Sequence, residues 1–130
     1  MNRSMLTMSL VFAGLLLAAI PALAHHSVSA EFDTTKPIEF TGTVKTVEWT
    51  NPHIYTQVEV KEANGTTKVY RVEGNPPNTL FRNGWRKDSL KVGQVVSVKG
   101  HAAKNPNSPN VGTATITTQD GKKVWAAQPE

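Results

Sequence analysis

Histidines are the residues of this chain best suited to hold a metal ion, and two of them, His25 and His26, are adjacent. If a peptidase cuts after Ala24, His25 becomes the first residue and offers a metal both its α-amine and its imidazole. The ordinary pKa values of an α-amine and an imidazole are about 7.7–8.0 and about 6.5, so both groups are available to a metal at neutral pH. A donor set made only of nitrogen favours Cu(II), with Ni(II) and Zn(II) behind it. The sequence therefore predicts a candidate copper site at a processed amino terminus.

The segment before these histidines has the three parts of a secretory signal peptide. Arg3 supplies a positive charge, Met5–Ile20 is an uncharged apolar run, and Ala22–Ala24 is a small-residue cleavage site. The run is shorter than the about 20 residues of a membrane-spanning helix. We therefore expect cleavage after Ala24, and a periplasmic or secreted protein without a stable membrane span. Val28–Ala30 is a second small-residue site, and a cut there would remove both histidines.

Two further histidines are the candidates for completing a metal site. His53 follows Asn51-Pro52 at the start of a predicted strand, and His101 ends another, both on the side that faces away from the core. The alternative interpretation is that the paired histidines form a solvated arm and that the other two are polar strand ends. The sequence leaves both interpretations open.

Alternating apolar residues predict a small all-β domain. The expected strands cover residues 38–49, 54–61, 66–73, 94–101 and 111–118, with a short last strand around Val124-Trp125. The apolar phase slips between Val44 and Val47, which indicates a β-bulge. Asn64-Gly65 predicts a hairpin closed by a type I′ turn.

A short helical segment, Thr79–Arg82, interrupts the strands and is closed by Gly84. We expect Leu80, Phe81 and Trp85 to cover one end of a barrel. Five or six strands with one short helix between the third and fourth are typical of the oligonucleotide/oligosaccharide-binding (OB) barrel. The predicted organisation is a signal peptide over 1–24, an N-terminal arm over 25–37, an OB-like barrel over 38–126 and a tail over 127–130.

A metal-independent binding face is the second functional hypothesis. Aromatic residues on an OB-like barrel can stack on ligands, and basic residues gather near the short helix. The candidate residues of this face are Trp49, Asn51, Tyr55, Arg82, Trp85 and Arg86. The same residues are also typical of barrel-end packing and of a solvated basic surface.

Composition narrows the function classes. The chain has no cysteine, which excludes disulfides and thiolate metal sites. Its formal net charge is +4, of which Arg3 contributes one, so we expect no dedicated nucleic-acid binding. Nucleophile-elbow and phosphate-loop motifs are absent from the sequence. We therefore expect a binding or accessory protein, with a metal ion or another periplasmic protein as partner, rather than an enzyme.

Several motifs resemble those of a family of small exported bacterial proteins of unknown function. The most specific are the His25-His26-Ser27 start and the block Trp49-Thr50-Asn51-Pro52-His53; Asn83-Gly84-Trp85 also matches. The resemblance implies a periplasmic or secreted OB-like barrel and implies no activity or cofactor.

Overall fold

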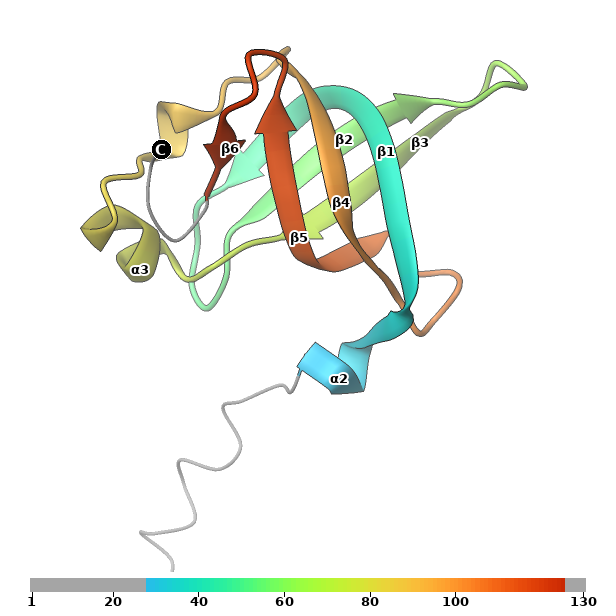
Figure 1. Cartoon of the computed structure of the whole chain (residues 1–130), viewed down its shortest axis with the longest axis horizontal. Helices are drawn as coiled ribbons and strands as arrows, with labels where there is room; N and C mark the ends of the chain where they lie inside the picture. Colours follow the sequence, from blue (N-terminus) through green and yellow to red (C-terminus); the bar gives the residue numbers. More distant parts are fainter. Residues whose placement is uncertain (1–27, 126–130) are drawn as a thin grey trace, which may run out of the picture.

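The computed structural model describes residues 28–125, and their strands close into one barrel (Figure 1). In chain order the elements are α2 (Val28–Glu31), β1 (Phe32–Glu48), β2 (Tyr55–Lys61), β3 (Thr67–Glu73), α3 (Pro77–Arg82), the 3-10 helix η2 (Lys87–Ser89), β4 (Val95–Ala103), β5 (Asn110–Thr118) and β6 (Lys123–Val124). The predicted signal peptide, His25, His26 and the predicted tail lie outside the described residues.

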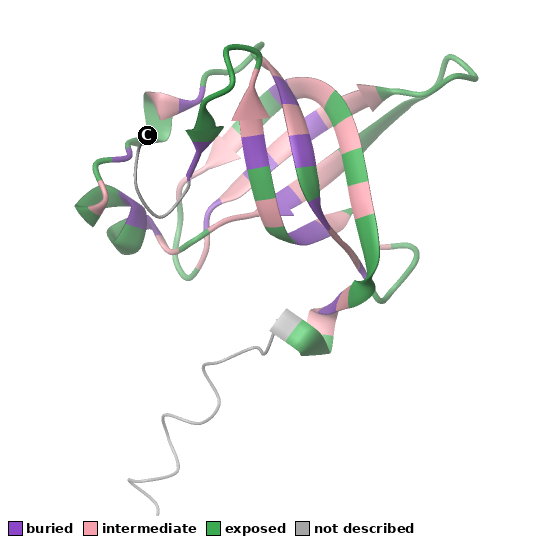
Figure 2. Cartoon of the chain, viewed as in Figure 1, coloured by how far each residue is buried: buried purple, intermediate pink, exposed green. Residues whose placement is uncertain are grey.

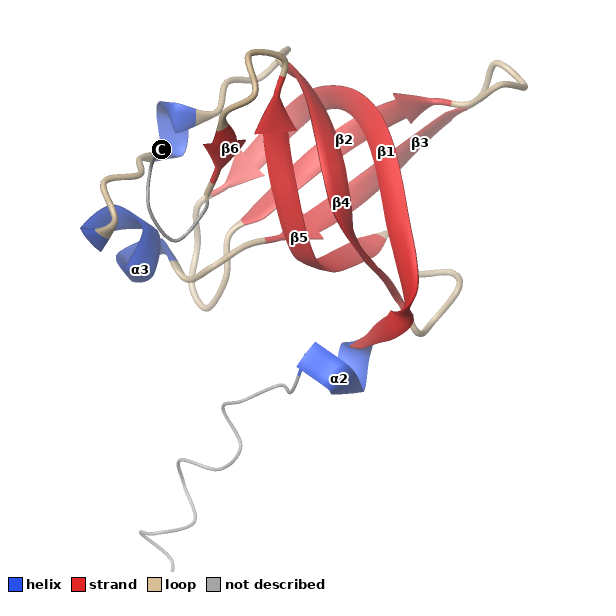
Figure 3. Ribbon diagram, viewed as in Figure 1, coloured by secondary structure: helices blue, strands red, loops and turns tan. Residues whose placement is uncertain are grey.

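The long strand β1 is shared between the two halves of the barrel. It pairs with β4 along its first part and with β2 along its second part, both antiparallel. The ring is closed by β3 and β5, which pair in parallel at Arg71↔Asn110 and Val72↔Val111. The resulting ring, β1-β2-β3-β5-β4 with α3 between β3 and β4, is that of a small OB-like barrel (Figure 3). The predicted fold class is confirmed.

The bend in β1 coincides with the predicted bulge. The register between β1 and β2 shifts between Val44 and Thr46, within the interval where the apolar phase slips in the sequence. A bulge adds one residue to one strand and increases its bend and twist. This irregularity therefore helps β1 to serve both halves of the barrel.

The hairpin between β2 and β3 forms at the predicted place with a different turn. Gly65 has a φ of 84°, whereas the described non-glycine residues with positive φ are Thr113 and Trp125, so Asn64 does not have the φ of a type I′ turn. The Glu62 amide donates to the Thr66 carbonyl at 2.8 Å, and the Gly65 amide donates to the Glu62 carbonyl at 3.0 Å. This is the pattern of a three-residue loop with a left-handed glycine. The predicted turn type is wrong because one residue, not two, adopts positive φ.

The core fills the inside of the barrel and the end beneath α3 (Figure 2). Val44, Val58 and Val98 are fully buried inside the ring. Leu80 and Trp85 are buried at the end, as expected, but Phe81 is 57% exposed. Successive residues on a helix point about 100° apart, so a helix that buries Leu80 turns Phe81 toward solvent.

The chain before Ile38 is packed on the barrel, within the segment assigned to the arm. Phe32, the first residue of β1, is 2% exposed, and it pairs with Ala103 of β4. The Lys104 amide donates to the Glu31 carbonyl at 2.9 Å. Residues 34–36 of β1 are exposed and polar, so this part of the sequence has no alternation of apolar and polar residues. The sequence pattern therefore does not reveal that β1 begins as early as Phe32.

Candidate functional site

His53 lies in the loop between β1 and β2, two residues before Tyr55, and its ring contacts the last residue of β3 and the residue after it. Its Nδ1 lies 2.9 Å from the carbonyl oxygen of Gly74 and 3.5 Å from Oε1 of Glu73. Both partners are acceptors, so in the neutral imidazole Nδ1 carries the proton and donates it. Nε2 then keeps its lone pair, and among residues 28–125 it has no hydrogen-bond partner. The His53 side chain is 38% exposed, so this nitrogen is available as an acceptor or a metal ligand.

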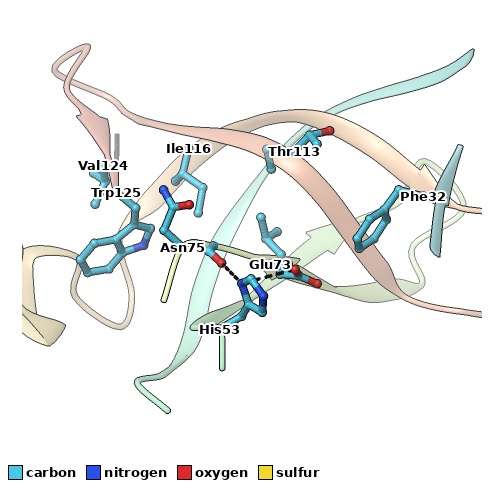
Figure 4. A pocket seen from close by; sticks show the side chains of 11 residues that line it. Phe32, His53, Glu73, Asn75, Thr113, Ile116, Val124 and Trp125 are labelled. Atoms are coloured by element: carbon cyan, nitrogen blue, oxygen red, sulfur yellow. Dashed lines mark hydrogen bonds and ion pairs between the residues drawn. The ribbon is translucent and has the colours of Figure 1, made fainter. Parts of the chain in front are cut away.

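A cavity opens beside His53 where β3 and β5 separate (Figure 4). The two strands pair only at two positions, and β6 pairs with β5 only at Ile116 and Thr117. The stretch of β5 between these pairings therefore borders a gap in the barrel wall. The gap forms a cavity of about 260 Å³. Its lining residues are Phe32, His53, Val72, Glu73, Gly74, Asn75, Thr113, Ala114, Ile116, Val124 and Trp125.

The course of β5 past the cavity depends on Gly112 and Thr113. Thr113 has a φ of 47°, a left-handed conformation that a β-branched residue rarely adopts. The register between β4 and β5 also shifts there, between Lys99 and His101. A Cβ atom on Gly112 would lie 2.3–2.6 Å from ring carbons of Phe32. A glycine is therefore needed for Phe32 to reach its place in the cavity wall.

Trp125 is one of the residues that line the cavity. It is 6% exposed, and its ring packs against Trp49 at 5.4 Å and against Trp85 at 5.9 Å between centroids. Its Nε1–H is buried, and it has no hydrogen-bond partner among the described residues. An unsatisfied buried donor costs about 1–3 kcal/mol. Trp49 and Trp85 thus belong to an aromatic cluster at the barrel end.

A polar network covers the outside of β1, β2 and β3. The Tyr55 hydroxyl donates to Oε2 of Glu73 at 3.4 Å, and the Arg71 guanidinium lies 3.4 Å from the centre of the Tyr55 ring. Arg71 also donates to Glu48 at 3.0 Å, and Gln57 donates to the same carboxylate at 2.8 Å. One face of the Tyr55 ring is therefore occupied by Arg71.

Two pKa values in this network are shifted. A hydrogen bond from Arg71, which has the larger effect, and one from Gln57 hold the pKa of the Glu48 carboxyl below its ordinary value. Burial, followed by the negative charge of Glu73, raises the pKa of the Tyr55 hydroxyl above its ordinary value. Tyr55 is thus neutral and Glu48 charged at neutral pH.

The four predicted metal-binding histidines are not assembled within the described residues. His101 lies on the outer side of β4 and β5, where its Nδ1–H donates to the Thr113 hydroxyl. It borders a separate shallow groove rather than the cavity beside His53. Residues 28–125 contain no group of three or more His, Asp or Glu arranged to hold a metal. His25 and His26 lie outside the described residues.

The predicted basic residues near α3 have mixed roles. The Arg86 guanidinium lies 3.9 Å from the centre of the Phe81 ring and donates to the carbonyls of Phe81 and Trp85 at 3.2 and 2.8 Å. Arg86 therefore holds the end of α3. Arg82 and Asn51 are exposed.

Sequence reasoning did not find the partners of His53. Glu73 and Gly74 lie some twenty residues further along the chain, and the β2–β3 hairpin brings them back. Tyr55 pairs with Glu73, and extending this register by two residues places His53 opposite Asn75. The Asn64-Gly65 turn was therefore the signal in the sequence that could have placed the residues after β3 beside His53. No local pattern indicates that Phe32 and Trp125 line the same cavity.

Comparison with known proteins adds the family and no activity. No helix within residues 28–125 has the length and apolar character to cross a bilayer. Neither the curated proteins nor the solved structures include a match to this chain. One family, described as "Family of unknown function (DUF6152)", matches residues 13–113, which is most of the chain. The chain, with its closed barrel and the cavity beside His53, therefore belongs to the DUF6152 family of unknown function.

Proposed function

We propose that the mature protein is an exported binding protein that holds a transition metal ion, Cu(II) first, between His53 and the histidines of its processed amino terminus. The observation that carries the proposal is the orientation of His53. Its Nδ1–H is donated to the Gly74 carbonyl and faces the Glu73 carboxylate. Metal-binding histidines characteristically donate their second ring nitrogen to such an oxygen, which fixes the tautomer and leaves the other nitrogen for the metal.

The anchoring of the early chain also supports the proposal. Phe32 lines the same cavity as His53. Just before it, the Asn110 side chain donates to Oε1 of Glu31 at 2.7 Å. His26 precedes Val28 by two residues, and a chain reaches at most about 3.3–3.6 Å per residue. Cleavage after Ala24 would therefore leave both amino-terminal histidines close to a segment that is fixed on the barrel.

The ligands of the proposed metal site are all nitrogen atoms, and this explains the choice of Cu(II). The α-amine and imidazole of His25 form a chelate, and His53 Nε2 would add a third nitrogen. His26 offers a further imidazole. Nitrogen ligands of this kind suit copper, and the Irving–Williams order places Cu(II) above the other divalent ions of its row.

The metal-independent binding face has less support. Arg71 covers one face of the Tyr55 ring, and Trp85 is 2% exposed. Arg86 is engaged with the end of α3. These contacts engage one face of the Tyr55 ring, the Trp85 ring and the Arg86 guanidinium within the barrel itself.

The experiment is a calorimetric titration of Cu(II) into protein that begins at His25. We expect H53A to weaken binding more than E73Q does, because Nε2 of His53 is the ligand and Glu73 only orients the ring. Loss of such an orienting group typically costs roughly tenfold or more in affinity. H101A is the matched control, since His101 lies in a different groove, and it should bind as the natural sequence does.

Two results would contradict the proposal. If H53A and H101A bind Cu(II) equally well, His53 is not a ligand. If one extra residue ahead of His25 leaves affinity unchanged, the free amine plays no part. The export step has its own test, because the mass of the secreted protein must correspond to a start at His25.

A further inference from the structure

We infer that the cavity between β3 and β5 is a binding site for an uncharged small molecule with an apolar body and one hydrogen-bond acceptor. This site goes beyond the proposed metal function, because it uses the interior of the cavity and requires no metal ion. The ligand would contact Trp125 and the apolar residues of the cavity, whereas the metal would bind to Nε2 of His53.

The buried indole of Trp125 is the first observation behind this inference. Its Nε1–H has no acceptor within residues 28–125, although the residue is buried, with only 6% of its surface exposed. Buried polar groups in folded proteins almost always have a partner. Trp125 lines the cavity, and Figure 4 shows its five-membered ring turned toward the side occupied by Asn75. The indole nitrogen is itself closed off by neighbouring atoms, so a ligand oxygen in the cavity would reach and satisfy this donor once the side chains beside it shift on binding.

The composition of the cavity wall selects the charge of the ligand. Phe32, Val72 and Ile116 supply apolar surface, and Glu73 supplies a carboxylate. Neither lysine nor arginine is among the described residues that line the cavity. An anionic ligand would thus meet a negative charge without a counter-charge, and desolvation would add to this cost. An uncharged ligand avoids both penalties.

The size of the cavity selects the size of the ligand. Its volume of about 260 Å³ is near the lower end of typical small-molecule sites, which are roughly 300–1,000 Å³. A single substituted aromatic ring is therefore a suitable occupant.

The test uses three probes of similar shape: p-cresol, toluene and p-toluate. Only p-cresol is uncharged at neutral pH and also carries an acceptor, because the ordinary pKa of a phenol is about 10. The ¹⁵N-labelled mature protein is titrated with each probe in EDTA, and the indole N–H signals of its tryptophans are followed by NMR. We expect p-cresol to move the Trp125 signal downfield in a saturable way. Toluene should give no downfield shift, and p-toluate should not bind.

Two variants test the two parts of the reasoning. W125F keeps the aromatic ring and removes the donor, so its affinity for p-cresol should fall roughly two- to tenfold while its affinity for toluene stays the same. E73Q removes the negative charge, so p-toluate should begin to bind. Dispersed indole signals of Trp49 and Trp85 report that each variant remains folded.

The inference is overturned if millimolar p-cresol gives no saturable shift of the Trp125 indole in EDTA. It is also overturned if p-toluate binds the natural sequence as well as p-cresol does. Either failure leaves the Cu(II) titration untouched, because EDTA excludes the metal from these measurements. Conversely, the p-cresol response is expected whether or not copper binds.

Discussion

Substitution of Gly112 by alanine is expected to force the ring of Phe32 out of the cavity wall and to lower the free energy of unfolding. The added Cβ would lie 2.3 Å from Cδ2 and 2.4 Å from Cε2 of Phe32. These atoms belong to a rigid ring that is 2% exposed, so the ring cannot simply swing away. Overpacking of this kind costs about 1–3 kcal/mol.

A smaller opposing effect reduces this cost. Gly112 does not adopt positive φ, so alanine fits the backbone there and restricts the unfolded chain, which stabilises by about 0.4–1 kcal/mol. Subtracting this gain from the overpacking cost leaves a net loss of up to about 2.6 kcal/mol. For a domain of this size, each kcal/mol lowers the Tm by roughly 4–8 °C.

The assay is urea denaturation, which gives the unfolding free energies of the natural sequence, G112A, F32A and the double variant. These four proteins form a double-mutant cycle. Without the Phe32 ring the clash disappears, so G112A in the F32A background should show only the unfolded-state effect and raise the unfolding free energy by about 0.4–1 kcal/mol. The coupling between the two sites then equals the overpacking cost of about 1–3 kcal/mol.

Gly42 offers a matched control. A Cβ there would lie 2.4 Å from the backbone oxygen of Glu59 and 2.8 Å from a methyl group of Val58, neither of which is Phe32. G42A should therefore cost the same with and without F32A. If G112A also costs the same in both backgrounds, Phe32 does not pack on Gly112, and the docking of the early chain beside the cavity is refuted.

Two further predictions concern the barrel itself. The Thr56 side chain is 1% exposed, and its hydroxyl oxygen has no partner among the described residues, so T56V should raise stability by about 1 kcal/mol and raise the Tm in calorimetry; an unchanged or lower Tm would mean that the hydroxyl is satisfied. The pKa of Glu48 is lowered by Arg71 and Gln57, so its stabilising contribution is present above the unfolded carboxyl pKa of about 4.3 and is lost as the pH falls through the folded value. E48Q should accordingly lose less stability than the natural sequence between about pH 5 and pH 3, measured by urea denaturation, and parallel pH profiles would contradict this account. At neutral pH the same change should cost under about 1 kcal/mol, because the ion pair is about one third exposed.

Local patterns in the sequence determined the strands, the bulge and the position of the short helix. Alternation shows which face of a strand is buried, and this information lies within a few neighbouring residues. The slip between Val44 and Val47 predicted the bulge for that reason, and the shift between Val44 and Thr46 confirms it. The hairpin at Asn64-Gly65 followed from composition, but its turn type depended on the φ of each residue and differed.

Only the tertiary structure decided where the candidate site lies. The pairing of β3 with β5 stops after two residue pairs, and this leaves an opening that no local pattern describes. Closure of the barrel brings Phe32, the first residue of β1, and Trp125, the last described residue, to the same cavity as His53. Such contacts between distant segments depend on how the strands close and on where they diverge. The chemistry of His53 could be read from its residue type, but its orientation by Gly74 and Glu73 is a property of the closed barrel.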